Sequence, residues 1–247
     1  MEYLDEDKVE TLTNRVEREI NEGLLPAAQI AIGFENKILF SKNFGDTKPD
    51  SLFCIFSATK AITAAASWLL MQEKVISEKD LVTEYIPEFG ENGKAKTTLS
   101  HLLTHTAGFP HAPFKPIEWK SKEARLRRFE QWRSFWEPGT KFEYHPSSSM
   151  YVVAEIIERA SGQDFGRFVQ DQILNRLQLR NTFIGLPNDQ SSRALPIRFC
   201  GVELSRQEYE KMGFPVPPET EVTEDAVLSF NERDVQASGI PGGGAFS

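Results

Sequence analysis

Ser57 and Lys60 are the residues of this sequence whose types and spacing could do nucleophilic chemistry. Side chains three positions apart on a helix share one side of it, with Cβ atoms about 5–6 Å apart, so this hydroxyl and this amine can meet. A serine hydroxyl is a weak nucleophile until a base removes its proton, and a neutral lysine amine can be that base. The pair therefore predicts a serine nucleophile activated by a lysine.

Lysine can act as this base only if its pKa falls from about 10.4 to about 7–8. Burial lowers the pKa of a lysine because it disfavours the charged form. The residues around the pair are largely apolar: Phe53, Ile55, Phe56, Ala61, Ile62, Ala64 and Ala65. One Ser-x-x-Lys pair is expected by chance in a chain of this composition, and the alternative is a helix-capping serine beside a solvated lysine. The segments around the pair must decide between them.

Helical and extended patterns surround the pair in an order that could position it. Val9, Leu12, Val16 and Ile20 recur at helical spacing, with Gly23 as the expected end of that helix. Residues 27–44 predict a hairpin that turns at 35–37, and residues 57–74 predict a long helix. Further helices are expected within 98–108, the second half of 111–135, 146–160 and 164–179, and a capping box is expected at 205–208.

Four segments, taken in order, make the sequence recognisable: FSATKAITAAASWLLMQEKVISEKDLVTEYIPEF, LSHLLTHTAGFP, EPGTKFEYHPSSSMYVVAEIIERASG and GIPGGGAFS. Together they resemble the serine β-lactamase and penicillin-binding-protein superfamily, in particular the class C β-lactamase and related esterase branch. The resemblance spans nearly the whole chain. It implies that Ser57 is the acylated nucleophile, that Lys60 is its basic partner, and that Tyr144 shuttles a proton between nucleophile and leaving group.

The position two residues after Tyr144 departs from the family pattern. The family commonly has Asn or Ser there, in contact with substrate and lysine, whereas this chain has Pro146. We expect His145 or Ser147 to take the polar, substrate-binding role. This departure favours esterase-like acyl transfer over β-lactam hydrolysis.

The family's third motif, Lys-Thr-Gly or His-x-Gly, does not occur after Tyr144. In the family it lies on a strand beyond the glycine-rich segment and lends a backbone N–H to the oxyanion hole. Losing one such donor costs about 2.7–4 kcal/mol of transition-state stabilisation. We therefore expect this chain to be a fragment or truncated product that is marginally stable and weakly active or inactive.

Four other features have plainer explanations. His101 and His105 have helical i, i+4 spacing, but no third metal ligand is evident, so we expect packing or capping at a helix end. Gly242–Gly244 is not followed by Lys and Ser or Thr, so it predicts a tight turn at the floor of the site instead of a phosphate loop. Cys54 predicts a small core residue. The arginine- and aromatic-rich stretch Trp119–Trp136 predicts a solvated helix face instead of a nucleic-acid surface.

The composition is that of an ordinary globular protein, with 247 residues, 40% of them hydrophobic and 26% charged. A formal net charge of -8 gives no support to nucleic-acid binding. No stretch approaches the roughly 18–20 apolar residues of a membrane span, and the acidic N-terminus lacks an apolar signal region. With two cysteines, a cytoplasmic location is expected. No metal or cofactor is expected, and the oligomeric state is left open.

We predict an α/β (α+β) fold of the β-lactamase/transpeptidase type, with an antiparallel sheet flanked by a helical region and its C-terminal strands missing. One incomplete domain, 1–247, is expected to comprise a helix and hairpin (1–56), a helical region with the catalytic motifs (57–185) and a Pro/Gly-rich segment (186–247). The predicted function is hydrolysis of a small-molecule ester or amide through an acyl-enzyme at Ser57. A β-lactamase or D-alanyl-D-alanine carboxypeptidase is an alternative, and so is a non-catalytic binding or assembly module, or an inactive fragment, of the same fold.

Overall fold

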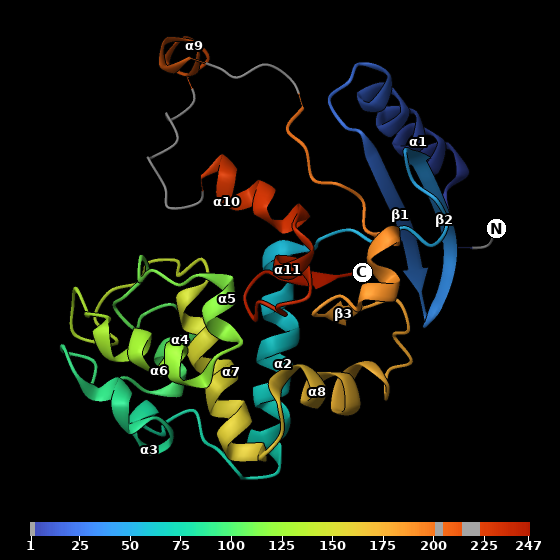
Figure 1. Cartoon of the computed structure of the whole chain (residues 1–247). Helices are drawn as coiled ribbons and strands as arrows, with labels where there is room; N and C mark the ends of the chain where they lie inside the picture. Colours follow the sequence, from blue (N-terminus) through green and yellow to red (C-terminus); the bar gives the residue numbers. More distant parts are fainter. Residues whose placement is uncertain (1–2, 201–204, 214–222) are drawn as a thin grey trace. The chain divides into compact units, whose positions relative to one another are not determined.

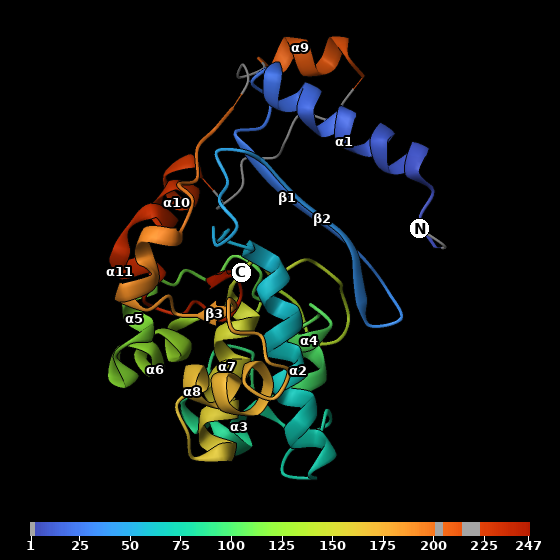
Figure 2. The same ribbon diagram turned by 90° about the vertical axis from the view of Figure 1, so that its right-hand side faces the viewer.

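The computed structural model of the chain describes residues 3–200, 205–213 and 223–247. The chain separates into two compact units, Met1–Ser51 with Leu195–Thr223 and Leu52–Ala194 with Glu224–Ser247. Figures 1 and 2 show the elements of each unit from two directions. The single domain with divisions at 56 and 185 stays a prediction, and each unit is described by itself.

A helix and a hairpin form most of the first unit. The helix α1 (Glu6–Asn21) begins after Asp5, whose carboxylate accepts a hydrogen bond from the Lys8 N–H. The strands β1 (Ala27–Phe34) and β2 (Lys37–Gly45) pair antiparallel, which confirms the predicted hairpin. Its turn consists of Glu35 and Asn36, whose φ angles of 47° and 61° are those of the tight turn that matches strand twist.

The same unit contains α9 (Arg206–Lys211), which begins with the predicted capping box. The Ser205 N–H donates to the Glu208 carboxylate at 2.7 Å, and the Glu208 N–H donates to the Ser205 hydroxyl at 3.4 Å. Residues 201–204 and 214–222 of the predicted Pro/Gly-rich segment lie outside the described residues.

The second unit is mostly helical. Its helices are α2 (Thr59–Gln72), α3 (Val82–Tyr85), α4 (Leu99–Leu103), α5 (Pro116–Trp119), α6 (Lys122–Gln131), α7 (Ser148–Ser161), α8 (Phe165–Val169), α10 (Glu224–Leu228) and α11 (Arg233–Gln236). Short 3₁₀ turns lie at Phe56–Ala58, Pro87–Gly90, Asn188–Arg193 and Ser229–Asn231, and a π-helical turn at Gln170–Leu174 continues α8. Among the described helices, none is both long enough and apolar enough to cross a membrane.

The core of this unit lies where α2 packs against α7 (Figure 1). Residues 148–157 of α7 are all buried, as expected for a helix that is surrounded by other elements. Aromatic side chains extend this core beside α7: Phe109, Phe114, Phe129, Trp132 and Tyr151. The predicted helix at 146–160 thus exists, but it begins at Ser148.

Three extended segments form a small antiparallel arrangement at the start of α2. The strand β3 (Phe183–Ile184) pairs with β4 (Ala245–Phe246), and residues 53–55 pair with 245–247 on the other side of β4. The Ile55 N–H donates to the Ala245 carbonyl at 2.9 Å, and Phe53 and Ser247 exchange two backbone hydrogen bonds. This pairing brings the glycine-rich segment beside the residues that lead into Ser57. Helices with small antiparallel sheets agree with the predicted fold class.

Candidate active site

Ser57 lies in the 3₁₀ turn Phe56–Ala58, immediately before α2 begins at Thr59. The preceding residue, Phe56, has a φ of 42°, a conformation that costs a residue other than glycine about 1–3 kcal/mol. Its ring packs 5.3 Å from that of Phe230, which helps to hold the turn. The strained turn leaves Ser57 exposed immediately before the first residue of α2.

The structure brings Ser57, Lys60 and Tyr144 together. The Lys60 Nζ lies 3.0 Å from the Ser57 Oγ, and the Tyr144 hydroxyl donates to the same Oγ at 2.7 Å. The Lys60 Nζ also lies 5.2 Å from the centre of the Tyr144 ring. Residues that are 87 positions apart in sequence therefore meet on one oxygen atom.

Two backbone carbonyls complete the surroundings of the Lys60 amine. Its Nζ donates to the carbonyl oxygen of Pro146 at 2.6 Å and to that of Gly242 at 2.7 Å. A neutral amine has two N–H bonds and one lone pair. It can donate to both carbonyls and accept the proton of the Ser57 hydroxyl, which is the arrangement a general base needs.

The pKa values of the two partners move in the directions that this chemistry requires. Burial lowers the pKa of Lys60 below its usual value, and the interaction with Tyr144 opposes that shift only in part. Burial tends to raise the pKa of Tyr144, but the hydrogen bond to Ser57 and the nearby Lys60 outweigh burial and lower it. Both shifts make it easier for the Lys60 amine to be neutral and for the Tyr144 phenol to give up its proton beside the serine.

The glycine-rich segment is held against α2 by threonine side chains one turn apart. The Ala245 N–H donates to the Thr59 hydroxyl at 3.1 Å, and the Thr63 hydroxyl donates to the Pro241 carbonyl at 2.6 Å. Both threonines are fully buried. They flank Lys60 in sequence and fix the segment so that the Gly242 carbonyl faces its amine. The predicted turn at the floor of the site is thus present.

His145 and Ser147, the predicted substrate-binding residues, have different surroundings. The His145 ring is fully buried, its Nε2 accepts from the Phe109 N–H at 3.1 Å, and its Nδ1 donates to the Glu143 carbonyl at 2.6 Å. Burial also lowers the pKa of His145 to about 4, so the ring is neutral near pH 7. Ser147 is half-buried, and no hydrogen bond to its hydroxyl occurs within the described part of the chain. The His145 side chain is therefore committed to hydrogen bonds within the protein, whereas the Ser147 hydroxyl is free to bind a substrate.

Sequence reasoning missed the two carbonyls and one positioning contact. The carbonyls of Pro146 and Gly242 are backbone atoms, and their roles have no side-chain signature. The third contact is made by His105, whose Nδ1 accepts a hydrogen bond from the His145 N–H at 3.1 Å. The only sequence signals were the proline in place of a polar residue and the glycine run.

His101 and Cys54, which the sequence also suggested as notable, make contacts that stabilise the fold. The N–H of Thr98 donates to the Nδ1 of His101, which caps α4 as predicted. Cys54 is partly buried, its thiol donates to the Gly243 carbonyl at 3.6 Å, and burial raises its pKa to about 11. Among the residues that the structure describes, no group of three or more His, Cys, Asp or Glu side chains could hold a metal ion.

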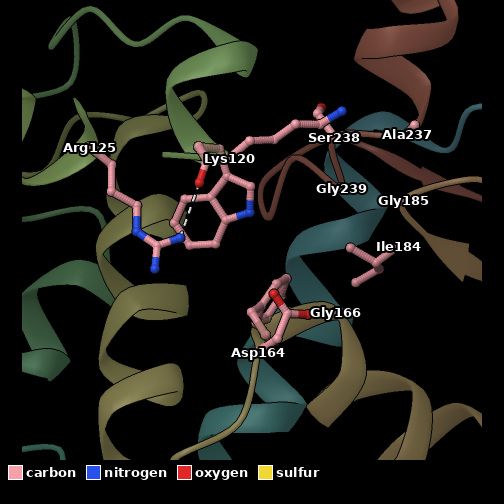
Figure 3. A pocket seen from close by; sticks show the side chains of 11 residues that line it. Lys120, Arg125, Asp164, Gly166, Ile184, Gly185, Ala237, Ser238 and Gly239 are labelled. Atoms are coloured by element: carbon pink, nitrogen blue, oxygen red, sulfur yellow. Dashed lines mark hydrogen bonds between the residues drawn. The ribbon is translucent and has the colours of Figure 1, made fainter. Parts of the chain in front are cut away.

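A second polar region lies at Arg125, beside a cavity of about 410 Å³ (Figure 3). The guanidinium of Arg125 stacks 4.3 Å from the Trp119 ring, donates to the Trp119 carbonyl at 3.1 Å, and forms ion pairs with Glu155 and Glu158. Lys120, Asp164 and the backbone around Gly185 and Gly239 line the rest of the cavity. None of its lining residues belongs to the Ser57 cluster.

The chain is similar to a known family and to several known proteins. The family model described as "Beta-lactamase" matches residues 12–198. The curated "Protein flp" of Staphylococcus aureus (strain MW2) is 28% identical over 204 residues, which cover 76% of this chain and 41% of that protein. A "Beta-lactamase" of Escherichia coli (strain K12) is 28% identical over 176 residues, which cover 68% of this chain and 46% of that protein. The chain thus spans less than half the length of these curated relatives.

A solved structure described as a family VIII carboxylesterase superposes with a TM-score of 0.75 at 23% identity. The match covers 93% of this chain and 63% of that one. This similarity shows the fold, and it confirms the predicted β-lactamase/transpeptidase-like architecture.

Proposed function

Because this chain belongs to the Beta-lactamase family, we propose that it is a serine hydrolase that acts on an ester or amide carbonyl through an acyl-enzyme at Ser57. The observation that carries the proposal is the meeting of the Lys60 amine and the Tyr144 hydroxyl on the Ser57 Oγ, at 3.0 and 2.7 Å. A solvated lysine would not be held within hydrogen-bonding distance of the serine oxygen and of two backbone carbonyls.

The proposed reaction begins when the Ser57 Oγ attacks the substrate carbonyl carbon and its proton passes to the Lys60 Nζ. A tetrahedral oxyanion forms, for which the Ser57 N–H is a suitable donor. No backbone carbonyl of the described residues accepts from that N–H. The bond to the leaving group then breaks, the leaving group takes a proton from the Tyr144 hydroxyl, and Lys60 returns a proton to Tyr144. Water finally cleaves the acyl-enzyme, releasing the acid and restoring the Ser57 hydroxyl.

Esterase-like specificity is supported by the position of Pro146. The related family commonly has a polar side chain here that contacts both lysine and substrate, whereas Pro146 offers Lys60 only its carbonyl oxygen. No side-chain donor from this position can then bind the amide group of a β-lactam substrate. A β-lactamase or a D-alanyl-D-alanine carboxypeptidase is the competing assignment within the same fold.

Labelling with a fluorophosphonate probe, followed by intact-mass measurement, tests the nucleophile. We expect one adduct on the wild-type chain, the same adduct on Ser41→Ala, a control at an exposed serine on β2, and no adduct on Ser57→Ala. An adduct that persists in Ser57→Ala would contradict the proposal. Parallel assays with a p-nitrophenyl ester and with nitrocefin then separate the two specificities, because faster turnover of nitrocefin would favour the β-lactamase assignment.

A further inference from the structure

The backbone N–H groups of Glu143 and His145, the residues on either side of Tyr144, both donate hydrogen bonds to one residue, His105. The Glu143 N–H donates to the His105 carbonyl oxygen at 3.1 Å, and the His145 N–H donates to the His105 Nδ1, also at 3.1 Å. The backbone on either side of Tyr144 is thus hydrogen-bonded to the same residue. Tyr144 itself is 44% exposed, so its own side chain has little packing to fix it.

The backbone of His105 has an unusual conformation that makes this double contact possible. Its φ is 58°, in the left-handed region that only a few per cent of residues other than glycine adopt. In this conformation its carbonyl and its ring Nδ1 both reach the segment 143–145. The left-handed backbone of His105 thus allows one residue to accept both hydrogen bonds from the neighbours of Tyr144.

The imidazole of His105 also contacts Tyr144 directly. The two ring centres lie 4.7 Å apart with an interplanar angle of 47°. Because the Nδ1 accepts a hydrogen bond, the proton of the neutral ring must lie on the Nε2. A neutral ring in this place limits the rotation of the tyrosine side chain without adding a second positive charge beside Lys60.

We infer that His105 is a positioning residue for Tyr144, which holds the phenol so that its hydroxyl stays on the Ser57 Oγ. The inference rests on the proposed function, because it assigns His105 a part in the activation of Ser57. His105 does not touch the reacting atoms and acts only through Tyr144. A displacement of about 1 Å in such a group can slow a reaction by about 10²-fold.

Substitutions at position 105 can separate the acceptor from the backbone conformation. His105→Asn keeps an acceptor atom at the δ position and tolerates positive φ, whereas His105→Gly accepts the same φ but has no side-chain acceptor. Gln178→Gly is the matched control, because Gln178 is an exposed residue with a φ of 57° that makes no contact with the site residues named above. The assay is Ser57-dependent release of p-nitrophenolate from a p-nitrophenyl ester, with the rate of Ser57→Ala subtracted.

We expect His105→Gly to lower kcat by about 10- to 100-fold with KM changed less than about twofold. His105→Asn is expected to stay within about threefold of wild type, and Gln178→Gly within about twofold. In a Tyr144→Phe background, His105→Gly should slow the reaction by less than about twofold more, because the group it positions is already gone. Equal slowing in both backgrounds, or an Asn variant as slow as the Gly variant, would overturn the inference.

Amide hydrogen exchange tests the contact without any activity. The His145 amide should exchange at least about tenfold faster in His105→Gly and remain protected in His105→Asn, whereas the Glu143 amide, bound to a backbone carbonyl, should remain protected in both. Unchanged His145 exchange in His105→Gly would contradict the proposed contact. If the wild-type chain shows no Ser57-dependent acylation, the proposed function fails, whereas the exchange result still decides whether His105 holds the segment.

Discussion

The carbonyl oxygen of Gly242 lies 2.7 Å from the Nζ of Lys60, although the two residues are 182 positions apart. Together with the Pro146 carbonyl at 2.6 Å, this contact provides acceptors for both N–H bonds of a neutral amine. The lone pair is then directed to the Ser57 hydroxyl. The chemistry of the site therefore depends on how often this amine is uncharged.

The rate of Ser57 acylation should rise with pH. Because burial lowers the pKa of Lys60 and only the neutral amine can accept the serine proton, raising the pH toward that pKa increases the active fraction. The measurement is kcat/KM for a p-nitrophenyl ester between about pH 6 and pH 9. A rate that falls as the pH rises over this range would rule out Lys60 as the base.

Replacing Lys60 by arginine should remove this pH dependence. An arginine keeps the positive charge and much of the length of the side chain, but it stays protonated at these pH values and cannot act as a base. We expect Lys60→Arg to slow acylation by about 10²- to 10⁴-fold and to flatten the profile. Lys120→Arg, an exposed lysine outside the Ser57 cluster, is the control and should behave as wild type. A Lys60→Arg variant that retained the pH profile would assign it to another group.

Alanine at Gly244 should be far more disruptive than alanine at Gly243. A Cβ on Gly244 would lie 2.7 Å from the Ile240 backbone nitrogen and 2.9 Å from the Ile240 Cβ, whereas a Cβ on Gly243 would meet only the Phe230 ring at 3.7 Å. Gly244→Ala is therefore expected to lower the free energy of unfolding by about 1–3 kcal/mol. It should also slow acylation, because the shifted turn withdraws the Gly242 carbonyl from Lys60. Urea unfolding of both variants checks this, and equal effects would contradict the role of the turn.

Lys94 should make the stability of the fold depend on pH in the alkaline range. Its side chain is fully buried, and its Nζ donates to the carbonyls of Glu91 and Trp132. Burial, opposed by the charges of Glu91 and Glu130, lowers its pKa to about 8. Between about pH 8 and pH 10.5 the unfolded chain binds more protons at this lysine than the folded chain does, so the free energy of unfolding rises with pH. This gain in unfolding free energy is lost again as the pH falls from about 10.5 to the folded-state pKa of about 8.

The variant Lys94→Met separates the pH-dependent contribution of Lys94 to stability from the contributions of the other titrating groups. The difference in unfolding free energy, wild type minus variant, should increase by about 2 kcal/mol between about pH 8 and pH 10. Urea unfolding at several pH values gives this difference, and parallel pH curves for the two proteins would contradict the assignment.

The parts of the structure that sequence reasoning could predict are those governed by local pattern. Periodicity predicted α1 and α2, and the capping box at Ser205 predicted the start of α9. The Ser57 and Lys60 spacing requires only one turn of helix, so their contact was also predictable. Tyr144 could be added only through the family resemblance, because nothing local links it to residues 87 positions earlier.

What could not be predicted depends on tertiary contacts. The helix expected from Pro146 begins at Ser148, because the Pro146 carbonyl faces Lys60 and the His145 ring enters the core. The two-residue strands β3 and β4 are too short to give an alternating pattern. His145 was expected to be polar and accessible because of its position beside Tyr144. Only the tertiary structure shows that the His145 ring accepts a hydrogen bond from the backbone N–H of Phe109.

Removal of Arg125 should destabilise the second unit more than removal of Arg128, three residues along the same helix. The Arg125 side chain is 9% exposed and pairs with Glu155, which is fully buried, and with Glu158. Arg128 pairs with Glu118 at 2.5 Å, but its side chain is 30% exposed. Arg125→Met leaves buried carboxylate without one of its cations and is expected to cost about 3–5 kcal/mol.

The matched variant Arg128→Met is expected to cost about 1 kcal/mol or less, because both members of its ion pair are partly exposed to water, at 30% and 17%, whereas Glu155 is fully buried. Free energies of unfolding in urea at neutral pH measure both variants. Acidification should narrow the gap between them, because burial raises the pKa of Glu158 and protonation of this carboxylate removes a charge that Arg125→Met leaves without its partner. Equal losses at neutral pH would show instead that the Arg125 region is open to water, as the adjoining cavity allows, and that burial does not set the strength of these pairs.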